Sequence, residues 1–214
     1  MLRALNLFTC AFALLSIVFG ESVSAFEPCD SPIVSYGPYD YRTERDKLAI
    51  VERTHFTSDV ETLRRGATSS TPAGDLNYTL LASPNHHRAL MAMANYSIRV
   101  GKERVPDAAF TTPCYFERAI RFAPDDGIVR LVFAIYLNKV GKKPEMVDQL
   151  KAAEELSISG ANNFYNMGLL FFEAGNYDKA LEYAHKASQL GFQLPGLRRK
   201  LESVGKWKEA SPTN

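Results

Sequence analysis

The pattern of apolar and polar residues along the chain changes near residue 83. From Pro84 onward, apolar residues recur at the spacing of one helix face, with few helix breakers between them. Residues 26–83 are instead rich in Pro, Gly, Ser, Thr and Tyr, which interrupt regular elements. We therefore expect an irregular N-terminal segment over 26–83, a helical domain over 84–208 and a short tail over 209–214.

One short helix is expected inside the N-terminal segment. Ser58, with Glu61 three residues later, has the sequence signature of a capping box, and Gly66 ends the run VETLRRG. The stretch DKLAIVERT, residues 46–54, fits a helix or a short strand equally well. Both interpretations of that stretch stay open.

The helical region contains an internal repeat. When the sequence is aligned with itself at an offset of 34 residues, residues of similar size coincide, and so do two glycines. The matched pairs include Phe133 with Met167, Ala134 with Gly168, Leu137 with Phe171, and Gly141 with Gly175. A fixed period of this length is typical of repeat architectures. Each unit predicts a helix, a turn at the glycine and a second helix, with helices expected over 127–140, 144–157, 161–174 and 177–190.

Gly168 lies inside a predicted helix, where glycine costs about 1 kcal/mol relative to alanine. Two antiparallel helices pack closely only where facing positions are small, and Ala180 and Ala187 supply such positions on the next helix. Large residues such as Met167 and Phe171 fill the adjacent space. We expect the burial gained by this close contact to offset the cost of the glycine.

Residues 161–194, ANNFYNMGLLFFEAGNYDKALEYAHKASQLGFQL, resemble a tetratricopeptide repeat, with Gly168, Ala180 and Ala187 at the small positions of that family. Residues 127–160 resemble it less closely, because Met146 replaces the second small residue. Residues 84–126 look like a degenerate unit, and 195–208 like the helix that covers the last repeat. The resemblance implies an all-α fold: a solenoid of about three helical hairpins with a C-terminal capping helix. As a whole the chain also resembles small secreted repeat proteins of Gram-negative bacteria.

The resemblance further implies a concave groove, lined by the first helix of each unit, that binds peptides. It assigns to that groove Ile128, Leu131, Ile135, Asn138, Asn162, Tyr165, Asn166, Leu169 and Phe172. Most of these residues are apolar, which favours an amphipathic helix or an extended apolar segment over a clamp for a terminal carboxylate. In the alternative interpretation these residues are core, covered by residues 26–83, with IVSYGPYDYR lying in the groove.

The first 25 residues have the pattern of a secretory signal peptide. Arg3 precedes an apolar run that is shorter than the ~20 residues needed to cross a bilayer. The segment ends in the small residues Val23, Ser24 and Ala25, which is typical of a signal-peptidase cleavage site. We expect cleavage near Ala25, a periplasmic or secreted protein, and no membrane span in the remaining chain. Cys29 and Cys114 then remain, either as a disulfide or as two separate buried thiols.

The charge balance and the absence of known motifs exclude several classes of function. The chain has 25 Lys+Arg and 24 Asp+Glu, so it lacks the basic excess of a nucleic-acid-binding domain. It contains no Ser-His-Asp spacing, nucleophile elbow, Gly-rich phosphate loop or HExxH motif. The adjacent His86 and His87 would point about 100° apart on a helix, and Ser83 or Asn85 is the expected cap of that helix. We predict no catalytic residue, no metal site and no cofactor.

The predicted function is therefore non-enzymatic: a protein-interaction scaffold or adaptor of the cell envelope that holds a peptide or helix of a protein partner in its groove. One alternative is a metal-binding or catalytic protein whose site lies in the N-terminal half, built from His55, Asp75 and either His86 or His87. A second alternative is a structural subunit of an envelope complex.

Overall fold

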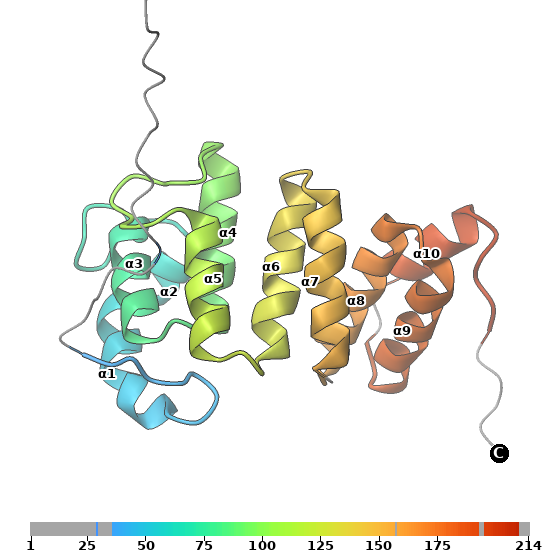
Figure 1. Ribbon diagram of the computed structural model, residues 1–214, viewed down its shortest axis with the longest axis horizontal. Helices are drawn as coiled ribbons and strands as arrows, with labels where there is room; N and C mark the ends of the chain where they lie inside the picture. Colours follow the sequence, from blue (N-terminus) through green and yellow to red (C-terminus); the bar gives the residue numbers. More distant parts are fainter. Residues whose placement is uncertain (1–28, 30–35, 157, 193–194, 210–214) are drawn as a thin grey trace, which may run out of the picture.

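The computed structural model describes residues 29, 36–156, 158–192 and 195–209. Throughout this part of the chain the regular structure is helical, without strands, which confirms the all-α class (Figure 1). The helices are α1 Arg45–His55, α2 Ser58–Glu61, α3 Pro72–Ala82, α4 His87–Val100, α5 Thr112–Phe122, α6 Gly127–Lys139, α7 Lys143–Glu155, α8 Ala161–Ala174, α9 Tyr177–Gln189 and α10 Gly196–Ser203. The predicted signal peptide over 1–25 lies outside the described residues.

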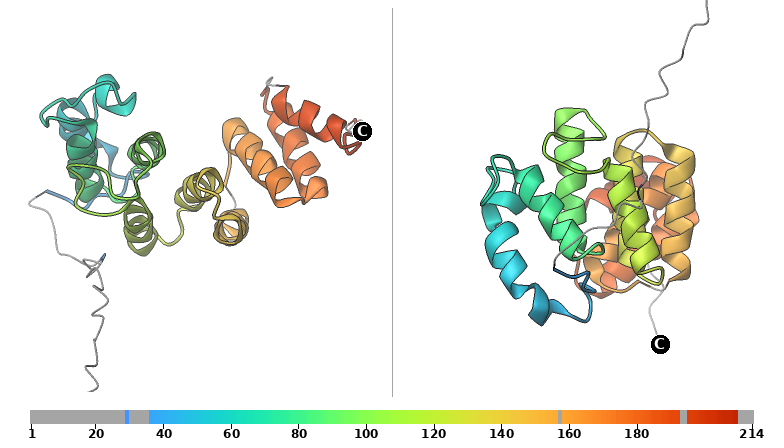
Figure 2. Two further views of the ribbon diagram at one scale, coloured as in Figure 1. Left: turned by 90° about the horizontal axis from the view of Figure 1, so that it is seen from above. Right: turned by 60° about the vertical axis from the view of Figure 1, so that its left-hand side comes forward.

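The helices form hairpins that stack side by side along one direction. α6 packs along α7 and α8 along α9, while α4 packs on α6 and α6 on α8. The stack is curved, with α4, α6 and α8 on its inner side and α5 and α7 on its outer side (Figure 2). Each second helix also contacts the first helix of the next hairpin, as α5 does with α6 and α7 with α8. This arrangement is that of a helical solenoid.

The expectation of an irregular segment is wrong for residues 45–82. α1 packs on α3 and α3 packs on α4, so these helices form a further hairpin with α2 in its connection. The stretch DKLAIVERT is thus helical, with Leu48 and Val51 buried. α3 begins with Pro72 in its first turn and buries Leu76 and Leu80 on one face. The turn-forming residues that suggested irregularity lie mainly ahead of α1 and in the connection before α3.

The short helix α2 exists, but its predicted cap is wrong. Its N-cap is Thr57, and no side chain caps it there. Ser58 is the first helical residue, where its carbonyl oxygen accepts a hydrogen bond from the Thr62 hydroxyl at 2.6 Å. Gly66 does not end the helix, because α2 ends at Glu61 and the intervening residues form a turn.

The turn predicted at the glycine of each repeat is confirmed. Gly141 and Gly175 both adopt positive φ, at 78° and 85°, immediately beyond α6 and α8. α9 then begins at an Asn176 cap, whose side-chain oxygen accepts a hydrogen bond from the Lys179 amide at 3.1 Å. A left-handed backbone conformation favours glycine, and the asparagine side chain accepts a hydrogen bond from an amide that has no partner within the helix. The position of this turn is therefore determined by local residue preferences.

Gly168 is buried where α8 meets both α9 and α10. A Cβ atom added there would lie 2.4 Å from Leu197 Cδ2 and 3.2 Å from the Ala180 carbonyl oxygen. Large rings fill the space beside it, with Phe171 stacked on Tyr183 at 5.4 Å between centroids. The close approach explains why a glycine occupies the helix interior, and α10 shares in this contact by burying Leu197.

Cys29 and Cys114 form a disulfide, with their sulfur atoms 2.19 Å apart and their Cα atoms 5.6 Å apart. The carbonyl oxygen of Cys29 also accepts hydrogen bonds from Arg118 and Arg121 at 2.9 and 3.0 Å. Of the two interpretations of the cysteines, the structure therefore favours the disulfide, which ties residue 29 to α5. No helix in the described ranges is both long enough and apolar enough to cross a membrane.

We predict that Gly168→Val lowers the free energy of unfolding by about 1–3 kcal/mol, because the new side chain has no space against Leu197 and Ala180. Urea unfolding followed by circular dichroism measures the change. Glu173→Val, at an exposed position of the same helix, is the matched control and should cost under about 1 kcal/mol. Equal losses for the two variants would contradict the close packing.

We predict that replacing Cys29 and Cys114 together by alanine lowers the free energy of unfolding by about 2–4 kcal/mol, because the disulfide closes a long loop in the unfolded chain. The measurement is urea unfolding of the oxidised protein with and without a reductant. The reductant should destabilise only the wild type, to the level of the double variant. If it leaves the wild type unchanged, the cysteines are not joined in solution.

Candidate functional site

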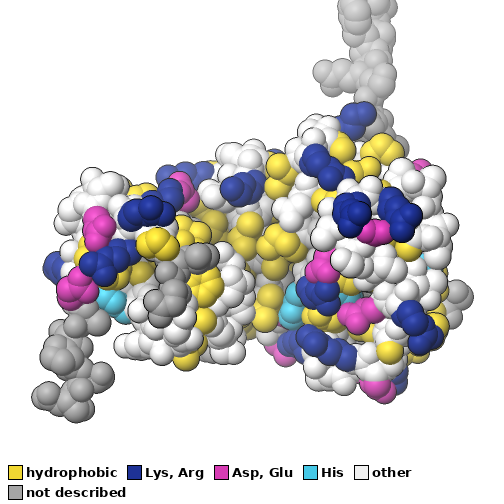
Figure 3. Space-filling view, turned by 180° about the vertical axis from the view of Figure 1, so that it is seen from behind, with side chains coloured by type: hydrophobic (Ala, Val, Ile, Leu, Met, Phe, Trp, Pro, Cys, Tyr) yellow, Lys and Arg dark blue, Asp and Glu magenta, His cyan; other side chains and the backbone are white. Residues whose placement is uncertain are grey.

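The inner side of the curved stack contains a hollow of about 340 Å³. Its floor comes from Met91 of α4, from Ile128, Leu131, Val132 and Ile135 of α6, and from Asn162, Asn163 and Asn166 of α8. Tyr41, Arg45, His87 and Arg88 line its other end. The space-filling view shows this face as a band of apolar side chains between the two ends of the molecule (Figure 3).

Five of the nine predicted groove residues line this hollow. They are Ile128, Leu131, Ile135, Asn162 and Asn166. On α6, residues 128, 131, 132 and 135 follow the i, i+3, i+4, i+7 spacing of one helix face. Leu131 is buried, whereas Ile128 and Ile135 remain half-buried. Since α6 also buries Phe133 and Leu137, it is apolar on both its core side and its groove side.

The other four predicted residues do not line the hollow. Tyr165 accepts a hydrogen bond from the Leu197 amide at 3.2 Å and packs on Phe192. Lys200 of α10 lies over the Phe172 ring, 5.1 Å from its centroid. Leu169 and Asn138 are half-buried outside the hollow. Tyr165 and Phe172 thus lie outside the hollow, because α10 and the loop before it contact that side of α8.

The described part of IVSYGPYDYR does not fill the hollow. Tyr36 and Tyr39 pack beside α1 and α3 in a small separate cluster. Only Tyr41 reaches the hollow, where it lies beside the rings of His86 and His87, with centroids 4.1 and 5.1 Å away. The described part of this segment therefore forms one end of the hollow and does not line its floor on α6.

The Tyr41 end of the hollow is basic. The Arg45 Nε donates a hydrogen bond to the Tyr41 carbonyl oxygen at 3.1 Å, and its guanidinium lies over the Tyr41 ring, 4.4 Å from the centroid. Arg88 pairs with Glu61 through two hydrogen bonds, yet 53% of its side chain is exposed. No Asp or Glu is among the residues that line this hollow.

A buried polar network holds this end in place. The Asn85 side chain accepts a hydrogen bond from the Tyr41 amide at 3.0 Å and donates to Asp40 and Asp126 at 2.8 and 3.0 Å. Asp126, which is 2% exposed, also caps α6 and accepts a hydrogen bond from His87 Nε2 at 2.7 Å. Burial raises the pKa of Asp126, but these hydrogen bonds and the nearby His87 outweigh it and lower the pKa overall. The network joins three loops around Tyr41.

The predicted caps of α4, Ser83 and Asn85, are both wrong, because the N-cap is His86. His86 Nδ1 accepts a hydrogen bond from the Ala89 amide at 3.1 Å, so Nε2 carries the proton and donates to Glu52 at 3.0 Å. The ring is fully buried, and burial lowers the pKa of His86 to about 3. Histidine is an unusual N-cap, which is why the sequence pattern did not indicate it.

The N-terminal half does not assemble the alternative metal site. His55 Nδ1 lies 2.9 Å from Asp75 Oδ1, as that hypothesis requires, but His86 and His87 bind Glu52 and Asp126 instead. Asp75 is buried and also accepts hydrogen bonds from the Ala67 and Ser69 amides, so it anchors the loop before α3. Among the described residues, no three His, Cys, Asp or Glu side chains are close enough to hold a metal ion.

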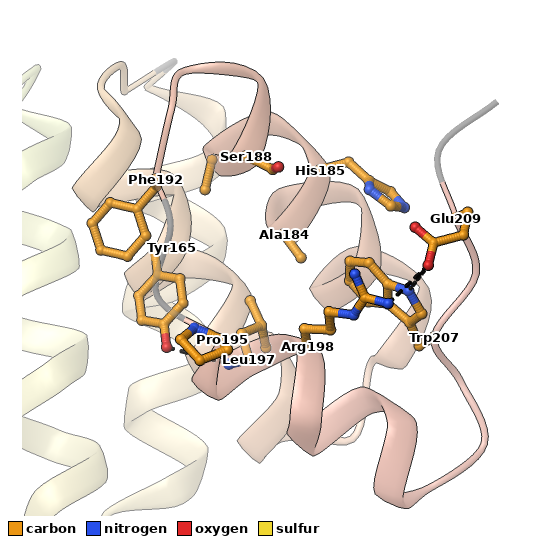
Figure 4. A pocket seen from close by; sticks show the side chains of 11 residues that line it. Tyr165, Ala184, His185, Ser188, Phe192, Pro195, Leu197, Arg198, Trp207 and Glu209 are labelled. Carbon is orange, nitrogen blue, oxygen red and sulfur yellow. Dashed lines mark hydrogen bonds and ion pairs between the residues drawn. The ribbon is translucent and has the colours of Figure 1, made fainter. Parts of the chain in front are cut away.

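A second cavity, of about 310 Å³, lies at the C-terminal end (Figure 4). Tyr165 and Phe192 form one wall, and His185 faces Trp207 at the other, with ring centroids 5.0 Å apart. Arg198 pairs with Glu209 at 2.9 Å beside Trp207. The only sequence signal of this cavity is the single tryptophan, which the sequence places after α10 without indicating a pocket.

Comparison with known proteins adds no relative. No protein-family model matches the chain, and no curated protein is significantly similar to it.

We predict that His86 makes the protein less stable as the pH falls. The unfolded chain takes up a proton at His86 below its ordinary pKa of 6.5, whereas the folded protein holds the ring neutral down to about pH 3. Between these values the unfolded state binds more protons, so stability rises with pH and is lost on acidification. The contribution of His86 to the free energy of unfolding is therefore about 3 kcal/mol smaller at pH 4 than at pH 7.

The variant His86→Asn tests this, because asparagine keeps a side-chain acceptor for the cap but does not titrate. Urea unfolding at several pH values should give a shallower pH dependence for the variant than for the wild type. Parallel curves for the two proteins would show that His86 is protonated equally in the folded and unfolded states.

Proposed function

We propose that this protein is a non-enzymatic scaffold of the cell envelope that holds a helix or peptide of a partner protein in the hollow between α4, α6 and α8. The observation that carries the proposal is the apolar stripe of α6 that forms the floor of the hollow. Ile128 and Ile135 are half-buried there, at the floor of the hollow between α4 and α8. Apolar surface gathered in a concave face favours a protein partner.

The resemblance to tetratricopeptide repeats supports the same proposal. The repeated spacing of small residues and glycines is accompanied by stacked helical hairpins, and the hollow lies on the row of first helices, where that family binds peptides. The signal-peptide pattern and the disulfide between Cys29 and Cys114 both favour an oxidising compartment, hence the periplasm or the cell exterior.

The function is tested by photo-crosslinking in the source cell. A photoreactive residue at Asn166, which lines the hollow, should give a discrete adduct with another protein. The control is the same residue at Lys151, exposed on α7 on the outer side of the stack, which should give none. Equal adducts from both positions, or an adduct from Asn166 to residues 26–35 of the same chain, would contradict the proposal.

We predict that Ile135→Glu abolishes the adduct formed from Asn166, because it buries a charge against the apolar floor when the partner binds. Val140→Glu, just beyond the end of α6 and exposed to solvent, is the matched control and should leave the adduct unchanged. Circular dichroism of both variants checks that each still folds. If both variants still form the adduct, the partner binds elsewhere on the surface.

A further inference from the structure

We infer that the partner segment is amphipathic and carries an acidic side chain, which binds Arg45 and Arg88 at the Tyr41 end of the hollow. This inference rests on the proposed function of the hollow and specifies the chemistry of what occupies it. It follows from the distribution of charge along the inner face of the stack.

Arg45 provides the first part of the argument. Its side chain lines the hollow and is exposed, and its guanidinium is fixed by the Tyr41 carbonyl oxygen and ring. No carboxylate of the described residues pairs with it. Glu44 is held by Lys47 at 2.7 Å and Glu52 by His86 at 3.0 Å. Arg45 is thus an oriented guanidinium whose remaining N–H donors face solvent at the edge of an apolar floor.

Arg88 lies beside it on α4 and is only partly neutralised. Glu61 occupies one edge of its guanidinium, and the rest of the side chain remains half exposed. The buried Asp126 is fully engaged with Asn85, His87 and the amides of α6, so it does not reach either arginine. Figure 3 shows Lys and Arg side chains beside the apolar band on the lobe formed by α1–α5, interspersed with Asp and Glu.

The opposite end of the hollow is uncharged. Asn162 and Asn166 line it from α8, and their side chains make no hydrogen bond to other described residues. A partner therefore meets cations at one end, amides at the other and an apolar floor between them. The floor from Ile128 to Ile135 spans about 10 Å along α6, which matches roughly two turns of an apolar helix face.

A carboxylate is the group that this asymmetry selects. Guanidinium groups bind carboxylates through charge-assisted, often bidentate hydrogen bonds, which are about twice as strong as neutral ones. A basic side chain in the same place would be repelled by Arg45, which no described carboxylate neutralises. The acid then also sets the direction in which the partner lies across α4, α6 and α8, because the far end offers it no cation.

The test uses the chain from residue 26 onward, with its disulfide intact, as bait for a phage-displayed library of random 12-residue peptides. Selected peptides are retained when Ile135→Glu abolishes their binding, which restricts them to the hollow. We expect these peptides to combine an apolar face with an excess of Asp or Glu near one end. Arg45→Glu should weaken their binding by about tenfold or more.

The matched control is Arg53→Glu, which makes the same charge change at an exposed position two turns further along α1 and outside the hollow. It should change binding less than twofold. Replacing the acidic residue of a selected peptide by Lys should restore its binding to Arg45→Glu and weaken its binding to the wild type.

The outcomes separate the two proposals. Peptides that need Ile135 but show no acidic excess, or that respond equally to Arg45→Glu and Arg53→Glu, would overturn the acidic partner and leave the scaffold function standing. A selection without any peptide sensitive to Ile135→Glu would contradict the binding hollow itself, and the acidic partner with it.

Discussion

Each helical hairpin in this chain has two apolar faces and can bury only one of them by itself, so its stability depends on the hairpin beside it. α6 shows the constraint most clearly, because it packs on α7 within its own hairpin and on α4, α5 and α8 outside it. At the C-terminal end, α10 takes the place of a further hairpin and buries Leu197 and Leu201 against α8 and α9. On the inner side of the row, Ile128 and Ile135 of α6 remain half-buried in the described part of the chain.

The two ends of the molecule are closed by different physical means. Small residues close the C-terminal end, where Gly168 brings α8, α9 and α10 together without leaving space for a Cβ atom. Buried hydrogen bonds close the N-terminal side, where Asn85 links the Tyr41 loop to Asp126 at the start of α6. Removing one member of such a network leaves its partners buried and unpaired, so substitutions in this network should be destabilising. The polar joint also fixes the position of Tyr41, and through it that of Arg45.

Local signals in the sequence identify the parts of the fold that local chemistry controls. The glycines at 141 and 175, the hairpins on either side of them and the small positions around Gly168 follow from period, size and backbone preference. The α1–α3 hairpin could not be predicted in this way, because its short apolar stripes are interrupted by Gly74 and by the buried Asp75.

Tertiary contacts determine what the sequence could not indicate at the site. Ile128 and Asn166 line the hollow on the face that the sequence indicated, because each lies on a long, regular helix. Tyr165 and Phe172 lie outside it because α10 and the loop before it contact them; the sequence indicated a capping helix but not which side chains of α8 it contacts. Arg45 belongs to the hollow through its contact with Tyr41, a residue of an irregular loop.

The disulfide gives the stack a mechanical asymmetry. A pulling force applied to the chain ahead of Cys29 passes through the sulfur bridge directly into α5 at Cys114. The residues between the two cysteines, which include α1 to α4, lie inside the closed loop and carry no tension along the backbone. The load falls instead on α6 to α10. A protein anchored at its two termini would therefore yield first in the hairpins that form the Asn-lined end of the hollow, while the basic end kept its shape.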